Sequence, residues 1–309
     1  MKIKSLLFPA LLLLFATSVR AQQDTAALIG RWDMTINMDG RTAPSWFEVY
    51  RSGYRTLVGE FVGTGGSARP VSLYHFSNGK LNFSLPPQWE GGSGEVSVEG
   101  AFAGDSLTGT ITYPDGKQFN WTAVHAPELK RTGEPSWGKS QQLFNGKDLT
   151  GWHAMGNTNQ WIVKDGVLQS PHSGANLVTD ETFNDFKLHI EFRYPPHSNS
   201  GVYLRGRYEL QIDNSGDEPY KDVISSIYGF IPPSEVADKG PNEWQSYDVT
   251  LVGRLVTVVF NGKTVICNRE IRGITGGAIN SREGEPGPIL IQGDHGPIEY
   301  RNITITKAK

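Results

Sequence analysis

The chain has 309 residues with 29 Lys and Arg, 32 Asp and Glu and a formal net charge of −3. A slightly acidic balance excludes proteins that hold nucleic acid through a broad basic surface. A single cysteine excludes an intrachain disulfide, so the stability of the fold must come from hydrophobic cores. This length favours two domains.

Residues 1–21 have the pattern of an export signal. Lys2 and Lys4 precede an apolar run at 6–15, and small residues lie around the cleavage-type position at 19–21. The run is too short to cross a bilayer, and no later run reaches that length, so no membrane span is expected. Cleavage there leaves 26 basic against 32 acidic residues and a net charge near −6. We expect a periplasmic or secreted protein that is not a lipoprotein, because Cys267 lies far from the processed end.

Residues 24–126 predict an N-terminal β domain. Turn residues are abundant, with 36 Gly and 18 Pro, and no long segment has helical spacing, so the whole chain should be nearly all-β. Eight short alternating runs should form a small antiparallel barrel or curled meander. The opening Gly30-Arg31-Trp32 resembles that of lipocalin-like barrels, with Trp32 as a core plug. Trp89, in a Pro/Gly loop, is either a sugar contact beside a neighbouring site or a lid of the barrel. The expected strands are 28–36, 46–51, 55–62, 71–76, 80–85, 95–102, 106–113 and 119–124.

Residues 127–139 lack alternation and are interpreted as a linker to a second domain at 140–309. The second domain has about ten short runs and turn signals such as Asn261-Gly262, which favour a two-sheet jelly-roll sandwich. Cys267 lies in one of these runs and is expected to be a buried thiol. The expected strands include 175–178, 186–194, 200–205, 207–213, 246–252, 255–260, 263–267, 288–292 and 298–306.

Several short motifs follow one another in the second domain. They are Phe-Asn-Gly-Lys-Asp-Leu-x-Gly-Trp at 144–152, Leu-x-x-Glu-Phe-Arg at 188–193, Asn-Ser-Gly-Val-Tyr-Leu-Arg-Gly at 199–206, Tyr-Glu-Leu-Gln-Ile-Asp-Asn at 208–214, Ile-Tyr-Gly at 227–229, Asn-Glu-Trp at 242–244, Phe-Asn-Gly-Lys at 260–263 and Tyr-Arg-Asn-Ile at 300–303. Together they resemble the 3-keto-disaccharide hydrolase domain family. The resemblance implies a concanavalin-like jelly roll whose concave face binds a carbohydrate oxidised at carbon 3. It also implies cleavage of the glycosidic bond by elimination and hydration, often with a divalent metal ion.

The alternation of 188–193 and 199–214 predicts three strands with one shared polar face. That face would carry Glu191, Arg193, Tyr203, Arg205, Glu209, Gln211 and Asp213. Arginines, carboxylates and amides fix hydroxyls and developing negative charge in defined geometry. The alternative is a lattice of Arg–Glu pairs that only holds the strands together.

Elimination from a 3-keto sugar needs a base for the proton on carbon 2, groups that stabilise the enolate and an acid for the leaving group. We expect Arg193 and Arg205 at the enolate oxygen and Glu191 or Glu209 as the base. His295, between glycines and beside an aspartate, is either an acid/base group or an ordinary loop residue.

Further side chains could hold the substrate or a metal ion. Glu209, Asp213 and His295 together offer oxygen and nitrogen ligands for a divalent cation, although their spacing is not diagnostic. The expected substrate contacts are Tyr203, Gln211, Tyr228, Trp244, Gln292 and Trp89.

Two other functions compete with 3-keto-glycoside hydrolysis. Jelly rolls often serve as non-catalytic carbohydrate-binding proteins, so a lectin-like role is the main alternative. The other is an ordinary two-carboxylate glycosidase that uses Glu191 and Glu209.

Overall fold

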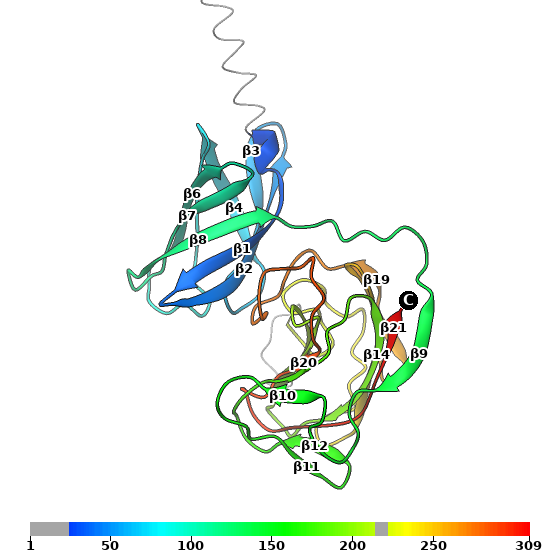
Figure 1. The fold of residues 1–309 in the computed structure, drawn as a ribbon. Coiled ribbons are helices and arrows are strands. Elements are labelled where there is room, and N and C mark those ends of the chain that lie inside the picture. The colour runs from blue at the N-terminus through cyan, green and yellow to red at the C-terminus, as the bar shows by residue number, and fades with distance from the viewer. Residues whose placement is uncertain (1–24, 214–221) are drawn as a thin grey trace, which may run out of the picture. The chain divides into compact units, whose positions relative to one another are not determined.

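The computed structural model describes residues 25–213 and 222–309. The expected export signal at 1–21 lies outside the described residues, as does most of the irregular segment that follows Asp213. The described chain divides into two compact units, mainly 25–125 and 126–309. Apart from one helical turn at 25–28, their regular elements are strands (Figure 1). None of the described helical segments is long and apolar enough to cross a membrane.

The first unit is a closed eight-stranded antiparallel barrel. Each strand pairs with the next, and β1 pairs with β8, with Trp32 opposite His125, to complete the circle. The expected barrel is therefore confirmed, and the curled meander is excluded by this closing pair. The strands are β1 (Gly30–Met38), β2 (Arg41–Ser52), β3 (Thr56–Val62), β4 (Arg69–Ser77), β5 (Lys80–Leu85), β6 (Val96–Ala103), β7 (Ser106–Thr112) and β8 (Gln118–His125).

Alternation along the strands fills the barrel with apolar side chains. In β5, Leu81, Phe83 and Leu85 are buried while the residues between them are exposed. Trp32 is fully buried, stacks on Phe47 with a ring-centroid distance of 6.0 Å, and donates its indole N–H to the Leu28 carbonyl at 2.9 Å. The predicted role of Trp32 as a core plug is confirmed.

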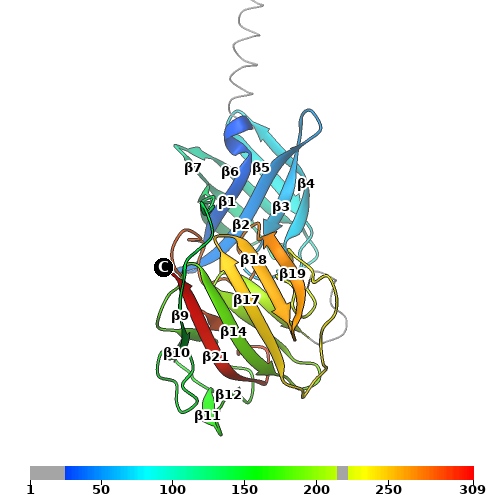
Figure 2. The same ribbon diagram turned by 90° about the vertical axis from the view of Figure 1, so that its right-hand side faces the viewer.

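The second unit is a two-sheet β-sandwich. One sheet has the order β10-β13-β20-β15-β16, and the other has the order β11-β12-β21-β14-β17-β18-β19, with β9 also paired to β21 (Figure 2). β9 begins at Trp137, inside the segment expected to be a linker. The strands are β9 (Trp137–Gln142), β10 (Trp152–Ala154), β11 (Ile162–Lys164), β12 (Val167–Ser170), β13 (Leu177–Thr179), β14 (Phe186–Arg193), β15 (Asn199–Leu204), β16 (Tyr208–Asp213), β17 (Gln245–Val252), β18 (Leu255–Phe260), β19 (Lys263–Glu270), β20 (Leu290–Ile291) and β21 (Ile298–Ala308).

Apolar side chains from both sheets fill the sandwich. Ile190 and Phe192 of β14 are fully buried, and the Phe192 ring lies 4.7 Å from that of Tyr247. The hydroxyls of Ser200, on β15, and Tyr300, on β21, lie 2.9 Å apart. Ser200 therefore marks the inner face of the five-stranded sheet, and its neighbours in sequence project from the opposite face.

Cys267 corrects one expectation, because its thiol is exposed. The pairing of β18 with β19 shifts register twice near Val258, and Val265 and Ile266 are buried in succession. The irregularity breaks simple alternation and turns the next residue, Cys267, towards solvent.

Candidate functional site

The hairpin of β15 and β16 builds a polar face on the five-stranded sheet. In its register Tyr203 pairs with Glu209, Gly201 with Gln211 and Asn199 with Asp213. Residues that face each other across an antiparallel pair project on the same side. Since Ser200 marks the inner face, these six residues lie on the face turned away from the eight-stranded sheet.

Chain segments on either side of the hairpin extend this polar face. The Gln292 N–H donates to the Gly201 carbonyl at 2.9 Å, next to the β15–β20 pair of Val202 with Ile291. On the other side, the Tyr228 N–H donates to the Glu209 carbonyl at 3.0 Å. The strand alternation therefore places Gln292 beside Gly201 and Tyr228 beside Glu209 on the same face. We call this polar face, with His295 at its edge, the candidate site.

Glu209 is the buried acid of the candidate site. It is 4% exposed, and its carboxylate lies over Gly201, where an added Cβ would be 2.3 Å from Oε1. Burial raises the pKa of Glu209 to about 8, with a smaller contribution from the charges of Asp294 and Asp213. The hydrogen bond with Tyr203 and the charge of His295 act in the opposite direction. Glu209 is consequently a neutral carboxylic acid for the most part at pH 7.

Tyr203 connects the Glu209 carboxyl to the backbone. Its hydroxyl lies 3.0 Å from the Gly276 carbonyl oxygen, to which it donates, and also makes a hydrogen bond with Glu209. Burial raises the pKa of Tyr203 well above its usual range, so the hydroxyl keeps its only proton. This proton can go to the Gly276 carbonyl or to the Glu209 carboxyl, and donation to Glu209 is what lowers the pKa of that group.

His295 and Asp294 form a second titratable pair. Nδ1 of His295 lies 2.7 Å from Oδ1 of Asp294, and the imidazole is about half exposed. The hydrogen bond to Asp294 raises the pKa of His295 above its usual value; partial burial acts against this increase, and the charges of Asp294 and Asp213 add to it. With Nδ1 bound to the carboxylate, Nε2 is the ring nitrogen available to a ligand.

Four buried oxygens on and beside the β15–β16 hairpin have no hydrogen-bond partner among the described residues. They are Oε1 of Gln211, Oε1 of Gln292, Oγ of Ser225 and Oγ of Ser226. Ser226 lies beside Gln211, whose N–H donates to the Ser226 carbonyl at 3.0 Å. Buried polar atoms are normally satisfied, so these oxygens are the ones that hydrogen-bond donors of a bound ligand would satisfy.

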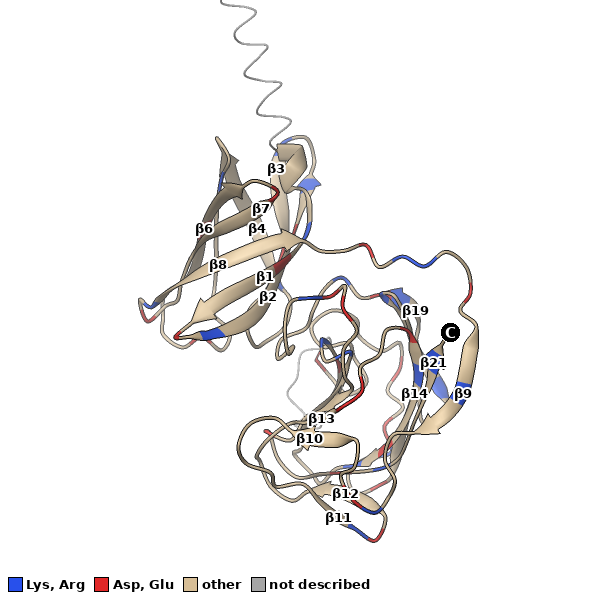
Figure 3. Ribbon diagram, viewed as in Figure 1, with Lys and Arg blue, Asp and Glu red and all other residues tan. Residues whose placement is uncertain are grey.

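Glu191 and Arg193 are not part of the candidate site, so the expected three-strand polar face is wrong. β14 pairs with β17 and β21 in the eight-stranded sheet, and not with β15. Glu191 accepts a hydrogen bond from Arg301 at 2.6 Å, and Arg193 donates to Glu299 at 2.6 Å. These residues form the Arg–Glu lattice considered as the alternative, on the outer face of β14 and β21; Figure 3 marks the Lys and Arg positions along these strands.

Arg205 is also displaced from its expected position. It has a φ of 53° in the turn after β15, so strand alternation does not continue through it. The side chain is 1% exposed and donates to the Tyr208 hydroxyl and the Gly253 carbonyl, each at 2.9 Å. Arg205 therefore belongs to the interior of the sandwich and is not beside Glu209.

Of the two expected tryptophan contacts, Trp244 lies elsewhere in the second unit, and the sugar contact of Trp89 stays a prediction. The ring of Trp244 has Arg193 at 4.8 Å and Arg301 at 3.9 Å from its centroid, which places it in the outer lattice. Trp89 belongs to the first unit, in the loop between β5 and β6, and is 72% exposed.

The residues expected to bind a metal ion are Glu209, Asp213 and His295. Among the described residues, no three His, Cys, Asp or Glu side chains come together as potential ligands, and this includes Glu209, Asp213 and His295. The expected divalent metal ion stays a prediction.

Sequence reasoning missed several groups of the site. Ser226 and the Gly276 carbonyl come from irregular segments whose position depends on tertiary pairing. The sequence identified Asp294 only as the neighbour of His295. It gave Gly201 no role, because glycine has no side chain to add to the polar face. Gly201 lies within a predicted strand, between Ser200 and Val202. Glycine weakens a strand interior and often marks a position where another group approaches the backbone closely, so this residue could have been identified from the sequence.

The whole candidate site lies within a family match. Residues 139–306, more than half of the chain, match the model of the 3-keto-alpha-glucoside-1,2-lyase-like domain. The chain belongs to this family. The expected 3-keto-disaccharide hydrolase resemblance is thereby confirmed, and the 3-keto-alpha-glucoside-1,2-lyase-like domain contains Tyr203, Glu209 and His295.

Similar proteins include a 3-keto-disaccharide hydrolase of Bacteroides thetaiotaomicron, 28% identical over 108 residues. That alignment covers 31% of this chain and only 36% of the relative. A Parabacteroides distasonis protein assigned as a glycosyl hydrolase is 29% identical, with a TM-score of 0.47, over 59% of this chain and 96% of its own. A second P. distasonis protein with the same assignment is 18% identical, with a TM-score of 0.48, over 55% and 94% of the two chains.

Proposed function

We propose that the protein cleaves the glycosidic bond of 3-keto-glycosides at the candidate site. The observation that carries this proposal is the pairing of two titratable groups with different environments on one face. Glu209 is buried and neutral, while His295 is half exposed and held by Asp294. Two groups whose pKa values are shifted by distinct surroundings are the usual arrangement for an acid and a base.

The chemistry of the substrate defines what the site must supply. A ketone at carbon 3 acidifies the hydrogen on carbon 2. When a base removes this proton, the electron pair forms a C1=C2 double bond and the C1–O bond breaks. The departing oxygen then takes up a proton, and the sugar remains as an enone. The site must provide a base, a proton donor and hydrogen-bond donors for the carbon 3 oxygen.

We assign the base to His295 and the acid to Glu209. Asp294 accepts the Nδ1 proton of His295, which leaves Nε2 to take the proton from carbon 2. Glu209 carries its proton at neutral pH and gives it to the departing oxygen, with Tyr203 hydrogen-bonded to the resulting carboxylate. The side-chain amides of Gln211 and Gln292 are the donors for the carbon 3 oxygen. This assignment replaces the enolate role expected of Arg193 and Arg205.

Elimination is the step shared by a lyase and a hydrolase for this substrate. The family description names a lyase, whereas the B. thetaiotaomicron relative is called a hydrolase. The two reactions differ only in whether water then adds to carbon 1 of the enone with a proton to carbon 2. We propose net hydrolysis, in which hydration follows elimination, and export of the protein through the signal at 1–21.

The proposal is tested by incubating the full chain with a 3-keto-disaccharide and with its unoxidised parent in deuterated water. Cleavage of the oxidised sugar alone, with deuterium at carbon 2 of the product, supports it. Binding without cleavage supports the lectin-like alternative, and cleavage of the unoxidised sugar supports an ordinary glycosidase. Either of these two outcomes overturns the proposal.

The role of Glu209 is tested by Glu209→Gln with two substrates. A glutamine cannot give a proton, so kcat for a 3-keto-disaccharide should fall by about 10²–10⁴-fold. A 3-keto-glucoside with a 4-nitrophenol leaving group needs little protonation, so its kcat should fall far less. An equal loss on both substrates would contradict the role of acid and indicate that Glu209 is the base.

A further inference from the structure

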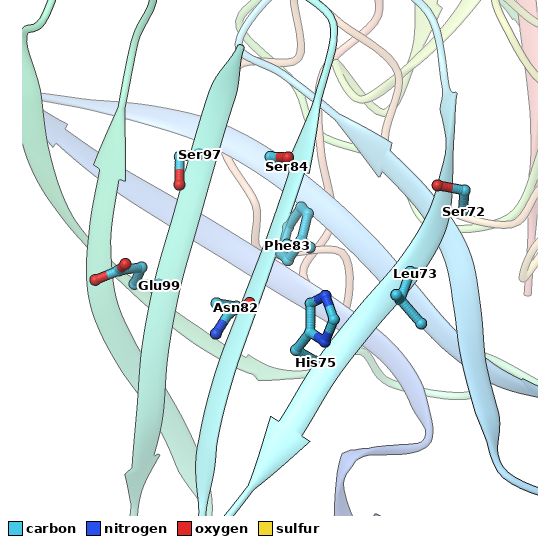
Figure 4. Close-up of a pocket in the computed structure, with 8 residues that line it drawn as sticks. All are labelled: Ser72, Leu73, His75, Asn82, Phe83, Ser84, Ser97 and Glu99. Carbon is cyan, nitrogen blue, oxygen red and sulfur yellow. The ribbon is translucent and has the colours of Figure 1, made fainter.

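The barrel of the first unit contains a polar pocket on its outer surface. The pocket has a volume of about 410 Å³ and lies across β4, β5 and β6 (Figure 4). Its polar side chains are Ser72 and His75 from β4, Asn82 and Ser84 from β5, and Ser97 and Glu99 from β6. This volume falls in the range of small-molecule sites.

A break in the sheet creates this pocket. β3 and β4 pair through Leu57 with Tyr74 and Gly59 with Val71, so β4 has one extra residue between these pairs. The result is a β-bulge in which Ser72 and Leu73 are both exposed in succession. At the same place the pairing of β4 with β5 ends, because its last pair is His75 with Asn82.

The break leaves backbone groups of Ser84 without a ladder partner. Asn78 and Gly79 have φ values of 51° and 71°, as in the type I′ turn of a hairpin whose flanking residues are hydrogen-bonded. Hydrogen-bonded pairs recur at every second position, so Lys80 and Asn82 are hydrogen-bonded to β4. The next hydrogen-bonded pair would join Ser84 to Leu73. That pair is absent among the described residues, although β5 continues to pair with β6 as far as Leu85. The Ser84 N–H and C=O consequently lie on the β4 side of β5, beyond the end of the β4–β5 ladder, and Ser84 lines the pocket.

The side chains that line the barrel pocket indicate which class of ligand it would bind. No Lys or Arg lines this pocket among the described residues, which disfavours phosphate or carboxylate ligands. The Ser84 hydroxyl donates to Glu95, and the remaining hydroxyls, an amide and a carboxylate offer both donors and acceptors, to which the Ser84 backbone adds one of each. Leu73, which is 41% exposed, offers an apolar contact at the rim. A neutral ring with several hydroxyls and an apolar face matches this combination.

We propose that the barrel pocket is a carbohydrate-binding site for neutral, unoxidised saccharides, separate from the candidate site of the second unit. Bound sugar hydroxyls would satisfy Asn82, Glu99 and the Ser84 peptide. The barrel then retains glycans by contacts that need no ketone at carbon 3. This site does not depend on the assignment of acid and base in the second unit.

The test is isothermal titration calorimetry of the full chain with maltose, cellobiose, sucrose and trehalose. At least one of them should bind, and Asn82→Ala and Glu99→Gln should each weaken that binding by tenfold or more. Both side chains are exposed, so the fold should survive. Asn120→Ala is the matched control, because Asn120 is an exposed asparagine on β8 that does not line the pocket.

A variant of the second unit separates the two sites. Gln211→Ala should leave the binding of these saccharides unchanged, since Gln211 belongs to the candidate site. Loss of binding in Gln211→Ala with retention in Asn82→Ala would overturn the proposal, as would the absence of binding to every saccharide. Self-association that Asn82→Ala abolishes, measured by sedimentation, would instead indicate strand pairing with a second copy and would also overturn it.

Discussion

The carboxylate of Glu209 lies directly over the Cα of Gly201, on the neighbouring strand of the β15–β16 hairpin. Only the missing side chain of Gly201 makes room for it, because a Cβ would be 2.3 Å from Oε1. Gly201 therefore determines where the proposed acid can lie.

Gly201→Ala should lower kcat/KM on a 3-keto-disaccharide by about 10²-fold, because the Cβ pushes the carboxyl away from the reacting atoms. Steady-state kinetics give the loss, and circular dichroism checks the fold. Gly65→Ala is the control, since a Cβ at Gly65 meets nothing within 4 Å and its backbone is not in the left-handed region. Full activity of Gly201→Ala would argue against Glu209 as the acid.

The pH dependence of kcat/KM should be bell-shaped. Activity rises as His295 loses its proton, at a pKa raised above 6.5, and falls above about 8, where Glu209 ionises. Removing the hydrogen-bonded carboxylate in Asp294→Asn should move the acidic limb to lower pH. Asp180→Asn, which alters the exposed pair of Asp180 with His153, should leave this limb in place. An acidic limb that is unchanged in Asp294→Asn would exclude His295 as the base.

Glu209 should make folding stability depend on pH. Its pKa is about 8 in the folded protein and about 4.3 in an unfolded chain. Below pH 4 both states hold the proton, and between pH 4 and 8 only the folded state does, so stability falls as the pH rises through this window. Glu209→Gln cannot ionise, so its melting temperature should exceed that of the wild type increasingly from pH 4 to pH 8. Melting curves with a constant difference across this range would contradict the buried, neutral state of Glu209.

The buried ion pair of Arg254 with Glu283 should be a determinant of stability. The two side chains lie 2.5 Å apart and are almost fully buried, and Glu283 also accepts the Tyr208 hydroxyl at 2.7 Å. Glu283→Gln leaves a buried guanidinium without its counter-ion, at a cost of about 3–5 kcal/mol. Glu191→Gln also removes the charge of a glutamate paired with an arginine, but on the partly exposed outer lattice, where the cost is about 1 kcal/mol or less.

Denaturant unfolding of these two variants distinguishes the buried pair from the outer one. The Glu283→Gln midpoint should shift well beyond that of Glu191→Gln, and both variants should keep their catalytic pH profile if they remain folded. Equal shifts would mean that burial of the Arg254–Glu283 pair adds nothing to the free energy of unfolding.

Local patterns predicted the strands well and their partners poorly. The alternation of β14 identified its polar side chains, and that of β15 and β16 correctly placed Tyr203 with Glu209 on one face. Alternation cannot tell which sheet a strand joins, so Glu191 and Arg193 were assigned to the wrong surface. Arg205 was assigned to the wrong place because its own positive φ ends the alternation of β15. The family motifs identified the domain but not the burial that makes Glu209 a neutral acid.

Adjacent residues of β16 have opposite tasks, since Tyr208 reaches the Arg254–Glu283 pair inside the sandwich and Glu209 faces outwards. A single inserted or deleted residue between Asn199 and Asp213 would exchange these faces, turning the polar groups into the sandwich and the apolar ones away from it. Because every residue of β15 and β16 except Asn199 is buried, this hairpin should accept few substitutions during evolution and almost no change in length.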